Sequence, residues 1–361
     1  MLIEVYKELA ANRLASAQAR AEALVNAYPN FHLGQLIYGD LLQMHTRPVD
    51  TLGAVGNAPA ERLADLREEA MVRLRSLRER PAPDLMPRPL LQLRDDQKHA
   101  LVVDAKRSRL YVYENRGGEL KFVSDYYISQ GKLGVNKLKE GDQKTPVGVY
   151  YITRRLPGVR LPDFYGPGAL PINYPNEWDR LNGRSGSGIW LHGTPSDSYS
   201  RPPLSSDGCV VLTNPDLKKL TASVEIGKTP VVIAENIEFV NRAKWASERE
   251  LAAGLVDQWR RDLEGQDAGK LALHYSSQFK SDRGEDFAGW YARKQLPAFN
   301  PRGFSVKLRD ATHFLYPGRG DMIVSTFTQE VTAGKFRHTA RKRQYWSREG
   351  GQWRIVHEAE I

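Results

Sequence analysis

Cysteine is almost missing from this chain, which contains one in 361 residues. A single thiol cannot form an intramolecular disulfide, so the fold depends on packed hydrophobic cores. The sequence also lacks an H-E-x-x-H motif and any cluster of cysteine and histidine at the spacing of zinc ligands. We therefore expect no metal and no other cofactor.

Long apolar runs are also missing. No stretch of about 18 apolar residues is present, which excludes a transmembrane helix. The first residues, MLIEVYKELAANRLASAQAR, form an amphipathic helix pattern and not a signal peptide. The net charge of +9 suggests anionic surroundings such as wall polymer, lipid headgroups or nucleic acid, or simply a solvated basic surface. No nucleic-acid-binding motif accompanies this charge, so no nucleic-acid partner is predicted.

The one cysteine, Cys209, lies in the stretch IWLHGTPSDSYSRPPLSSDGCVVL, residues 189–212, which also contains His192. Both ends of the stretch, 189–192 and 209–212, are typical of strands. The loop between them is rich in residues that favour turns, namely Gly193, Pro195, Pro202, Pro203, Asp207 and Gly208. If the two strands are neighbours, this loop returns Cys209 to the side of His192.

A cysteine beside a histidine supports nucleophilic acyl transfer, because an imidazole can generate or stabilise the reactive thiolate. Gly208 permits a tight turn in which main-chain N–H groups face a developing oxyanion. The alternative is a buried and inert thiol, since free cysteine is among the most buried residue types. One cysteine and one histidine do not decide between these interpretations.

Two motifs favour the reactive thiol. HGT at 192–194, followed by S-x-G-C-V at 206–210, resembles the active-site signature of the L,D-transpeptidase catalytic family (YkuD-type). Upstream, GDQKTPVGVY at 141–150 resembles the GD-x-x-TP-x-G-x-Y segment of the same family. The resemblance extends over about residues 97–236, and it implies a mainly-β catalytic domain.

The resemblance also implies roles for individual residues. Cys209 would be the nucleophile and His192 the base, which the carbonyl group of Gly193 would orient. The N–H groups of Gly208 and Cys209 would form an oxyanion hole.

Two further residues have alternative interpretations. Ser206 either forms a hydrogen bond across the loop or is only a turn residue. Trp190 shares a face with His192 if both lie on one strand. It then either lines a substrate groove or is a core aromatic.

The motif departs from the usual family form, S-H-G-C followed by a hydrophobic residue and Arg or Asn. Asp207 stands where the second histidine is expected, and Val211 replaces the polar residue. Acyl-enzyme formation should survive, but the choice of acceptor becomes open. Asp207 could repel an anionic acceptor, or it could recruit an amine or water. With its C-terminal domain, this variant resembles the branch that includes cell-shape-determining L,D-carboxypeptidases.

The family resemblance implies a substrate, the tetrapeptide stem of peptidoglycan, cut between diaminopimelate and D-alanine. An amine acceptor would give a 3–3 crosslink or protein attachment, and water would give a tripeptide stem. Two other functions are alternative interpretations: a non-catalytic wall-binding scaffold and a cytosolic thiol hydrolase. Because the implied substrate lies outside the cytoplasm, we expect a periplasmic protein whose leader is not part of this sequence.

The fold class predicted for the whole chain is α+β with several domains. Residues 1–90 are predicted to be a helical region with a helix from Leu2 to about 27, another at about 32–45 and a third at about 60–80. This order resembles a tetratricopeptide-type hairpin, although a plain packing subdomain explains it equally. Arg62, Arg67, Glu68 and Glu69 are expected on the solvent side, and the proline-rich segment 81–89 is expected to be a linker.

In the second domain, 97–236, strands are expected from residue 98 onward, with a long surface loop at 156–175, a short helix at about 215–222 and a closing strand at 229–235. A hinge at 237–245 would lead into the third domain, 246–361. There, helical sequence at 247–279, interrupted near Gly265, a short helix from Asp286 to Gln295 and four C-terminal strands resemble a nuclear transport factor 2-like α+β cone. Its aromatic residues could line a site for a small ligand or a protein, or could fill a core: Trp259, Tyr275, Trp290, Tyr291 and Trp346.

Overall fold

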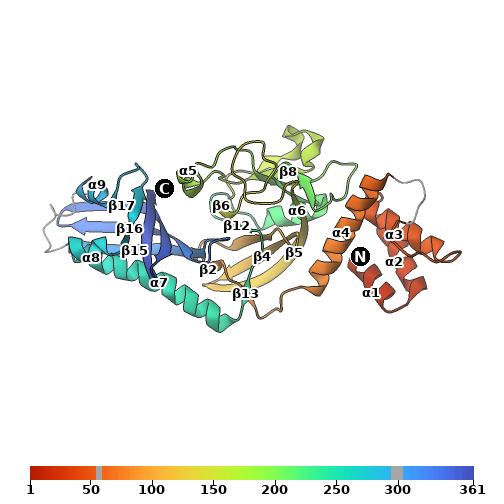
Figure 1. Ribbon diagram of the computed structural model, residues 1–361, viewed down its shortest axis with the longest axis horizontal. Coiled ribbons are helices and arrows are strands. Elements are labelled where there is room, and N and C mark those ends of the chain that lie inside the picture. Colours follow the sequence, from red (N-terminus) through yellow and green to blue (C-terminus); the bar gives the residue numbers. More distant parts are fainter. Residues whose placement is uncertain (54–58, 294–303) are drawn as a thin grey trace.

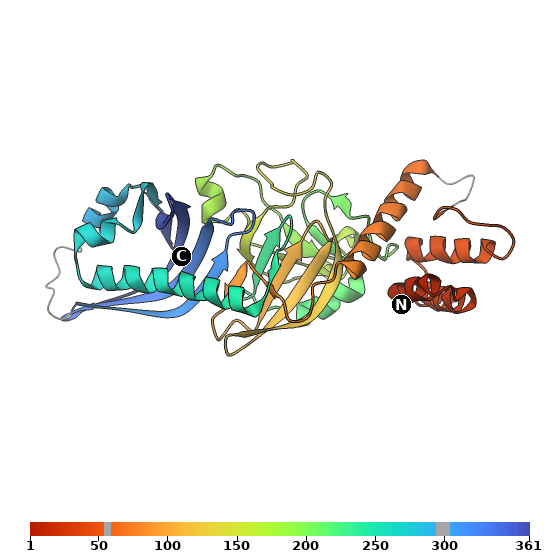
Figure 2. The same cartoon turned by 60° about the horizontal axis from the view of Figure 1, so that its bottom comes forward.

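The computed structural model describes residues 1–53, 59–293 and 304–361. The molecule is elongated, with a bundle of N-terminal helices at one end, a C-terminal sheet with its helices at the other and a central domain between them (Figures 1 and 2). The predicted α+β class is confirmed, because strands dominate the central and C-terminal parts, while the N-terminal part is helical.

Four helices form the N-terminal part: α1 (Leu2–Ala10), α2 (Leu14–Ala27), α3 (His32–Gln43) and α4 (Ala60–Arg78). The single helix predicted over residues 2–27 is therefore wrong. Residues 11–13 separate α1 from α2, and Asn12 adopts a positive φ of 55°, a conformation that asparagine tolerates better than most residues. The prediction for Glu69 is also wrong. Its side chain is only 2% exposed and pairs with Arg73 one helical turn later.

The central domain is organised on one curved sheet with strand order β6-β12-β3-β4-β5-β11-β9-β8-β7, and β10 also pairs with β5. The strands are β3 (His99–Asp104), β4 (Arg109–Arg116), β5 (Glu119–Gly131), β6 (Gly148–Tyr151), β7 (Leu156–Pro157), β8 (Gly168–Pro171), β9 (Trp190–His192), β10 (Leu204–Ser206), β11 (Val210–Leu212) and β12 (Pro230–Ala234). Helix α6 (Asn214–Ala222) begins at Thr213, whose side chain accepts a hydrogen bond from the Asp216 N–H. Its buried leucines pack on the core of the sheet.

The segment 156–175, predicted to be a long surface loop, contains more structure than its prolines and glycines suggest. It forms the short strands β7 and β8 and two 3-10 turns, Gly158–Arg160 and Asp163–Tyr165. Strand β8 pairs with β9, so part of this segment belongs to the sheet beside His192. Helix α5 (Glu177–Leu181) follows, opened by a capping box between Asn176 and Asp179.

The C-terminal part contains a six-stranded sheet with order β14-β18-β17-β16-β15-β2. Its elements are α7 (Arg242–Glu264), α8 (Ala268–Ala272), β14 (Tyr275–Ser281), α9 (Phe287–Arg293), β15 (Phe304–Leu315), β16 (Met322–Ala333), β17 (Phe336–Glu349) and β18 (Gln352–Glu360). The four predicted C-terminal strands and the break near Gly265 are confirmed. Strand β14 occupies residues 275–281, so the predicted helical sequence is wrong at 275–279, and Gln295 lies outside the described residues.

The predicted linker (81–89) and hinge (237–245) each contain a two-residue strand, and these two strands pair with each other. Strand β1 (Met86–Pro87) pairs with β13 (Phe239–Val240), and β2 (Leu90–Gln92) adds an edge to the C-terminal sheet beside β15. Prolines are tolerated in such short edge strands because these strands need few donated hydrogen bonds. Helix α7 starts at Arg242, directly after β13, and runs along the C-terminal sheet (Figure 2).

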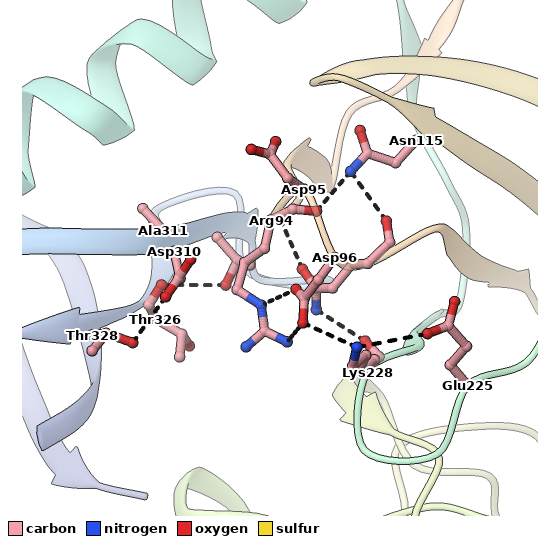
Figure 3. A network of polar contacts seen from close by, with 12 residues as sticks. Arg94, Asp95, Asp96, Asn115, Glu225, Lys228, Asp310, Ala311, Thr326 and Thr328 are labelled. Atoms are coloured by element: carbon pink, nitrogen blue, oxygen red, sulfur yellow. Dashed lines mark hydrogen bonds and ion pairs between the residues drawn. The ribbon is translucent and has the colours of Figure 1, made fainter.

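Polar contacts reinforce the junction beside β2, as Figure 3 shows. The guanidinium of Arg94 donates to Asp96, which also pairs with Lys228 at 3.3 Å. The side chain of Asn115 donates to the carbonyl groups of Arg94 and Gln97 at 2.7 and 3.1 Å. Residues 94–97, which follow β2, are therefore attached to the central domain through side chains as well as through the chain itself.

The central and C-terminal domains share one hydrophobic core. Buried residues of the central sheet, such as Val149 and Val232, belong to the same cluster as Phe327 and Trp346 of the C-terminal sheet. The predicted aromatic residues lie in this cluster: Trp259, Tyr275, Trp290 and Trp346 are at most 3% exposed, and Tyr291 packs against them. Their mutual contacts support the core interpretation, and a ligand at this domain stays a prediction.

Candidate active site

The two strands that carry the motif residues lie side by side. Strand β11 runs parallel to β9, with Val210 paired with Leu191 and Val211 with His192. Cys209 immediately precedes β11, and its Sγ atom lies 3.4 Å from the carbonyl oxygen of Gly188, just before β9. The sequence expectation that the loop returns Cys209 to the strand of His192 is therefore confirmed.

His192 is buried, and its ring is fixed by the next residue. Its Nδ1 atom lies 2.7 Å from the carbonyl oxygen of Gly193. Because a carbonyl group only accepts, Nδ1 carries the proton and Nε2 is left as the basic nitrogen. Gly193 is held in turn, since its N–H donates to the carbonyl group of Tyr165 at 3.1 Å. A Cβ atom on Gly193 would overlap with Oδ1 of Asn214, so only glycine fits this position.

Burial sets the charge state of both reacting groups. It lowers the pKa of His192 to about 4, and the nearby charge of Arg201 lowers it too, against the hydrogen bond to Gly193. Burial raises the pKa of the Cys209 thiol to about 11, and the N–H of Trp190 acts in the opposite direction. At neutral pH, the site therefore contains a neutral thiol and a neutral imidazole. Such an imidazole is able to accept the thiol proton as a general base.

The turn before the cysteine is closed by Ser206. Its hydroxyl donates to the carbonyl group of Cys209 at 2.6 Å and accepts from the N–H of Gly208 at 3.1 Å. Both hydrogen bonds of Ser206 lie within the turn 206–209, which fits the interpretation of Ser206 as a turn residue. The Gly208 N–H is therefore engaged within the turn, while the Cys209 N–H donates to none of the residues that the structure describes. The oxyanion role stays a prediction that concerns mainly Cys209.

The upstream motif, residues 141–150, forms hydrogen bonds with this turn. The hydroxyl of Thr145, which is fully buried, donates to the carbonyl group of Gly208 at 3.0 Å and accepts from the Gly131 N–H at 3.0 Å. Asp142 closes the preceding loop by accepting from the N–H groups of residues 138, 139 and 144 and from Lys137. Burial raises the pKa of Asp142, but these donors outweigh it and hold the pKa well below its usual value.

Aromatic rings cover one side of His192. Tyr165 meets the imidazole edge-on at 5.0 Å between ring centroids and contacts Trp190 at 5.0 Å. Phe164 lies 5.8 Å from the imidazole, measured in the same way, and is 47% exposed. Trp190 is half-buried at the edge of this group. These rings form an aromatic cluster against His192, and a substrate-groove role for Trp190 stays a prediction.

The two residues that depart from the usual motif lie in different environments. Asp207 is exposed, and its carboxylate accepts from Lys132 at 3.1 Å and from Gln143 at 3.3 Å. Val211 is buried within β11. Asp207 is therefore the departure that solvent and an acceptor can reach.

Four residues of the site escaped the sequence analysis: Thr145, Asn214, Phe164 and Arg201. Thr145 lies in the GD-x-x-TP motif, which offered a signal for it. Arg201 lies within the loop between His192 and Cys209, and its guanidinium stacks on Phe164 at 4.2 Å. Neither Phe164 nor Asn214 carries a local sequence signal, because only the tertiary fold brings Phe164 to His192 and Asn214 to Gly193 and Thr194.

Among the residues that the structure describes, no group of three or more histidine, cysteine, aspartate or glutamate side chains could hold a metal ion. Within the same residues, no helix is both long and apolar enough to span a bilayer.

Comparison with known proteins assigns both large domains. Residues 98–233 match the L,D-transpeptidase catalytic domain (YkuD), and residues 251–359 match the Cds6 C-terminal NTF2-like domain. Two curated relatives, both named "Putative L,D-transpeptidase YafK" and from Escherichia coli strains K12 and O157:H7, are 26% identical over 130 residues. That segment covers 35% of this chain and 48% of the relatives, so the chain spans about half of their length.

Solved structures extend the similarity over both domains. Bd1075 from Bdellovibrio bacteriovorus is 28% identical, with a TM-score of 0.67 over 77% of this chain and 98% of its own. The helical cell shape determining protein Pgp2 from Campylobacter jejuni is 24% identical, with a TM-score of 0.64 over 75% and 95% of the two chains, and it shows the shared fold. The chain therefore contains a catalytic domain of the L,D-transpeptidase family, followed by an NTF2-like domain.

Proposed function

We propose that this protein is a peptidoglycan-modifying cysteine acyltransferase that acts on tetrapeptide stems. The observation that carries the proposal is the hydrogen bond from His192 Nδ1 to the Gly193 carbonyl oxygen, on a strand adjacent to that of Cys209. This bond directs the basic nitrogen away from the backbone and makes it available to a thiol. A protein that only bound the wall would not need a histidine held in this tautomer.

The reaction has two halves that share one thioester. The Cys209 thiol passes its proton to His192 Nε2, and the sulfur attacks the carbonyl carbon between diaminopimelate and D-alanine. The Cys209 N–H donates to the resulting oxyanion. When the C–N bond breaks, His192 returns the proton to the amine of D-alanine, which leaves. The stem is then held on Cys209 as a thioester.

In the second half, an amine acceptor attacks the thioester and releases the thiol, giving a 3–3 crosslink or an attached protein. His192 takes the proton of the amine and returns it to the sulfur. The alternative is hydrolysis, which would make the protein an L,D-carboxypeptidase. The exposure of Asp207 is a reason to consider hydrolysis, because a carboxylate beside the thioester can hinder an anionic acceptor stem. The ammonium of Lys132 partly offsets the negative charge of Asp207, so we place transfer to an amine first.

The location that suits this substrate is the periplasm, where stem peptides are found. The peptidoglycan-acting family of the catalytic domain supports this proposal. Pgp2 is described as a cell shape determining protein, and a role of this chain in cell shape is part of the same proposal.

Mass spectrometry of purified muropeptides incubated with the wild type and with Cys209→Ala tests the proposal. New 3–3 dimers would identify a transpeptidase, and release of D-alanine to give tripeptides alone would identify an L,D-carboxypeptidase. The Cys209→Ala variant should make neither product. Products that persist in this variant, or no product with the wild type, would refute the assignment of Cys209.

A further inference from the structure

Arg201 is a cation close to the reacting groups that has no carboxylate partner. Its guanidinium is half-buried, and it forms no ion pair with any aspartate or glutamate that the structure describes. Its contacts are the ring of Phe164, 4.2 Å from the guanidinium carbon, and the Phe164 carbonyl oxygen, 3.4 Å from Nη2. Because no carboxylate of the described residues engages this half-buried guanidinium, its N–H donors are available to an anion.

The position of Arg201 links it to both reacting residues. Phe164, on which the guanidinium stacks, also lies against the His192 ring, at 5.8 Å between centroids. Burial lowers the pKa of Arg201, and the nearby Cys209 and Asp207 act in the opposite direction. An anionic group bound at Arg201 would therefore lie near the thiol and not on a distant surface.

The backbone around Arg201 is held rigidly. Its carbonyl oxygen accepts two hydrogen bonds from β5, from the Tyr127 hydroxyl and the Ser129 hydroxyl, both at 2.9 Å. The preceding residue, Ser200, donates to the buried carboxylate of Glu69 on α4 at 2.7 Å. Rigid support of this kind preorganises a side chain for binding, because less conformational entropy is lost when the ligand arrives.

We propose that Arg201 binds a carboxylate of the donor stem and is a specificity-determining residue of this enzyme. The inference rests on the proposed function, in which the donor carries carboxylates on both sides of the scissile bond, one on terminal D-alanine and one on the side chain of diaminopimelate. Charge-assisted hydrogen bonds from the guanidinium orient the donor so that its carbonyl carbon faces Cys209. Val211 cannot supply such a contact from its buried place in β11.

The first test uses small reagents and does not depend on the natural substrate. Iodoacetate and iodoacetamide both alkylate a thiolate, but only iodoacetate carries a carboxylate. In Arg201→Gln, the ratio of their rate constants at Cys209 should fall about tenfold relative to the wild type, because a charge-assisted contact of ordinary strength is lost. The ratio for Arg201→Lys should lie between the ratios of the wild type and Arg201→Gln. The control Arg154→Gln, at an exposed arginine after β6, should have the wild-type ratio. If Arg201→Gln slows alkylation by both reagents equally, Arg201 acts only on the reactivity of the thiolate, and the proposal is overturned.

The second test identifies the carboxylate. Amidation of the D-alanine carboxylate or of the diaminopimelate side chain in a tetrapeptide should lower the wild-type kcat/KM about 10- to 100-fold at one of the two positions. Arg201→Gln should show the same loss with the unmodified peptide and no further loss when that carboxylate is amidated. If the variant responds to both amidations as the wild type does, Arg201 binds neither carboxylate.

The two tests separate the possible failures. A wild type that turns over no muropeptide but retains the iodoacetate preference would refute the proposed function and leave the anion site at Arg201. A wild type that is active while Arg201→Gln keeps both its kcat/KM and its reagent ratio would refute the role of Arg201 and leave the proposed function. Circular dichroism of each variant shows whether the fold is intact.

Discussion

The pKa values of His192 and Cys209 correspond to a neutral imidazole and a neutral thiol at neutral pH, and not to a resting ion pair. The cause is desolvation, which penalises the charged form of each group and moves the two pKa values apart, to about 4 for His192 and about 11 for Cys209. In the proposed reaction, the thiol therefore becomes nucleophilic only when its proton moves to His192 during attack. Between these two values, the resting state has no net charge on either group.

This charge state predicts an unusual dependence of activity on pH. His192 accepts a proton only while it is neutral, so activity is lost as the pH falls through its pKa. We expect the acid limb of kcat/KM near pH 4, below the ordinary histidine value of about 6.5. Rates of a tetrapeptide substrate measured from pH 3.5 to 9 in buffers of constant ionic strength test this.

Alkylation of the thiol provides an independent check of the same charge state. The rate of alkylation of Cys209 by iodoacetamide should increase with pH up to about pH 11, since only the thiolate reacts. An acid limb at about 6.5, together with alkylation that is already maximal at pH 7, would indicate a resting ion pair and contradict the predicted charge state.

At the scale of elements, the segment 194–206 links His192 to Cys209 and is held by the N-terminal helices. The ring of Tyr199 lies between Tyr28 and Phe31, with centroids 4.6 Å from each, and its N–H donates to the Asn30 carbonyl group at 3.2 Å. The side chain of Asn30 donates to the Ser196 carbonyl group at 3.2 Å. The helical part is thus not only a separate packing unit, because it positions the segment that carries Arg201.

Tyr199→Ala tests this positioning. Removing a half-buried aromatic ring should cost about 2 kcal/mol of packing at the contact and let the segment move away from the helices. We expect faster amide hydrogen exchange in residues 194–206 and a kcat/KM lowered about tenfold, with exchange in β3 and β4 unchanged. Tyr199→Phe, which keeps the ring contacts, serves as the matched control. Unchanged exchange in the alanine variant would show that the helices do not hold the segment.

Local patterns predicted the elements that depend on local sequence and missed those that depend on partners. The strands at 99–131 and 304–360 follow from alternation and turn residues, and the neighbouring strands at His192 and Cys209 were expected from the turn-rich loop between them. Strands β1 and β2 have two and three residues, too few for a period, and exist only because β13 and β15 offer an edge. Glu69 was misplaced for a similar reason, since its helix pattern contains no sign of Ser200, which lies 131 positions away.

For the molecule as a whole, the shared core joins the catalytic and NTF2-like domains, whereas the N-terminal helices have a core of their own. A charged group at the domain interface adds specificity to this contact. Glu177 on α5 accepts from Arg343 at 2.6 Å and from the Tyr345 hydroxyl at 2.8 Å, and Trp178 stacks on Tyr345 at 5.0 Å. Burial raises the pKa of Glu177, but Arg343 outweighs it, so the carboxylate stays ionised against the buried guanidinium.

Glu177→Gln should therefore lower the free energy of unfolding of the two joined domains by about 3 kcal/mol, because Arg343 is left buried without its counter-charge. In denaturant titrations that follow tryptophan fluorescence, both domains should still unfold in one transition with a lower midpoint. Glu119→Gln, at an exposed glutamate on β5, is the control. The double variant Glu177→Gln/Arg343→Met should recover part of the loss, since it removes the unpaired charge. Two separate transitions in the wild type would contradict the shared core, and a double variant no more stable than Glu177→Gln would contradict the role of the buried charge.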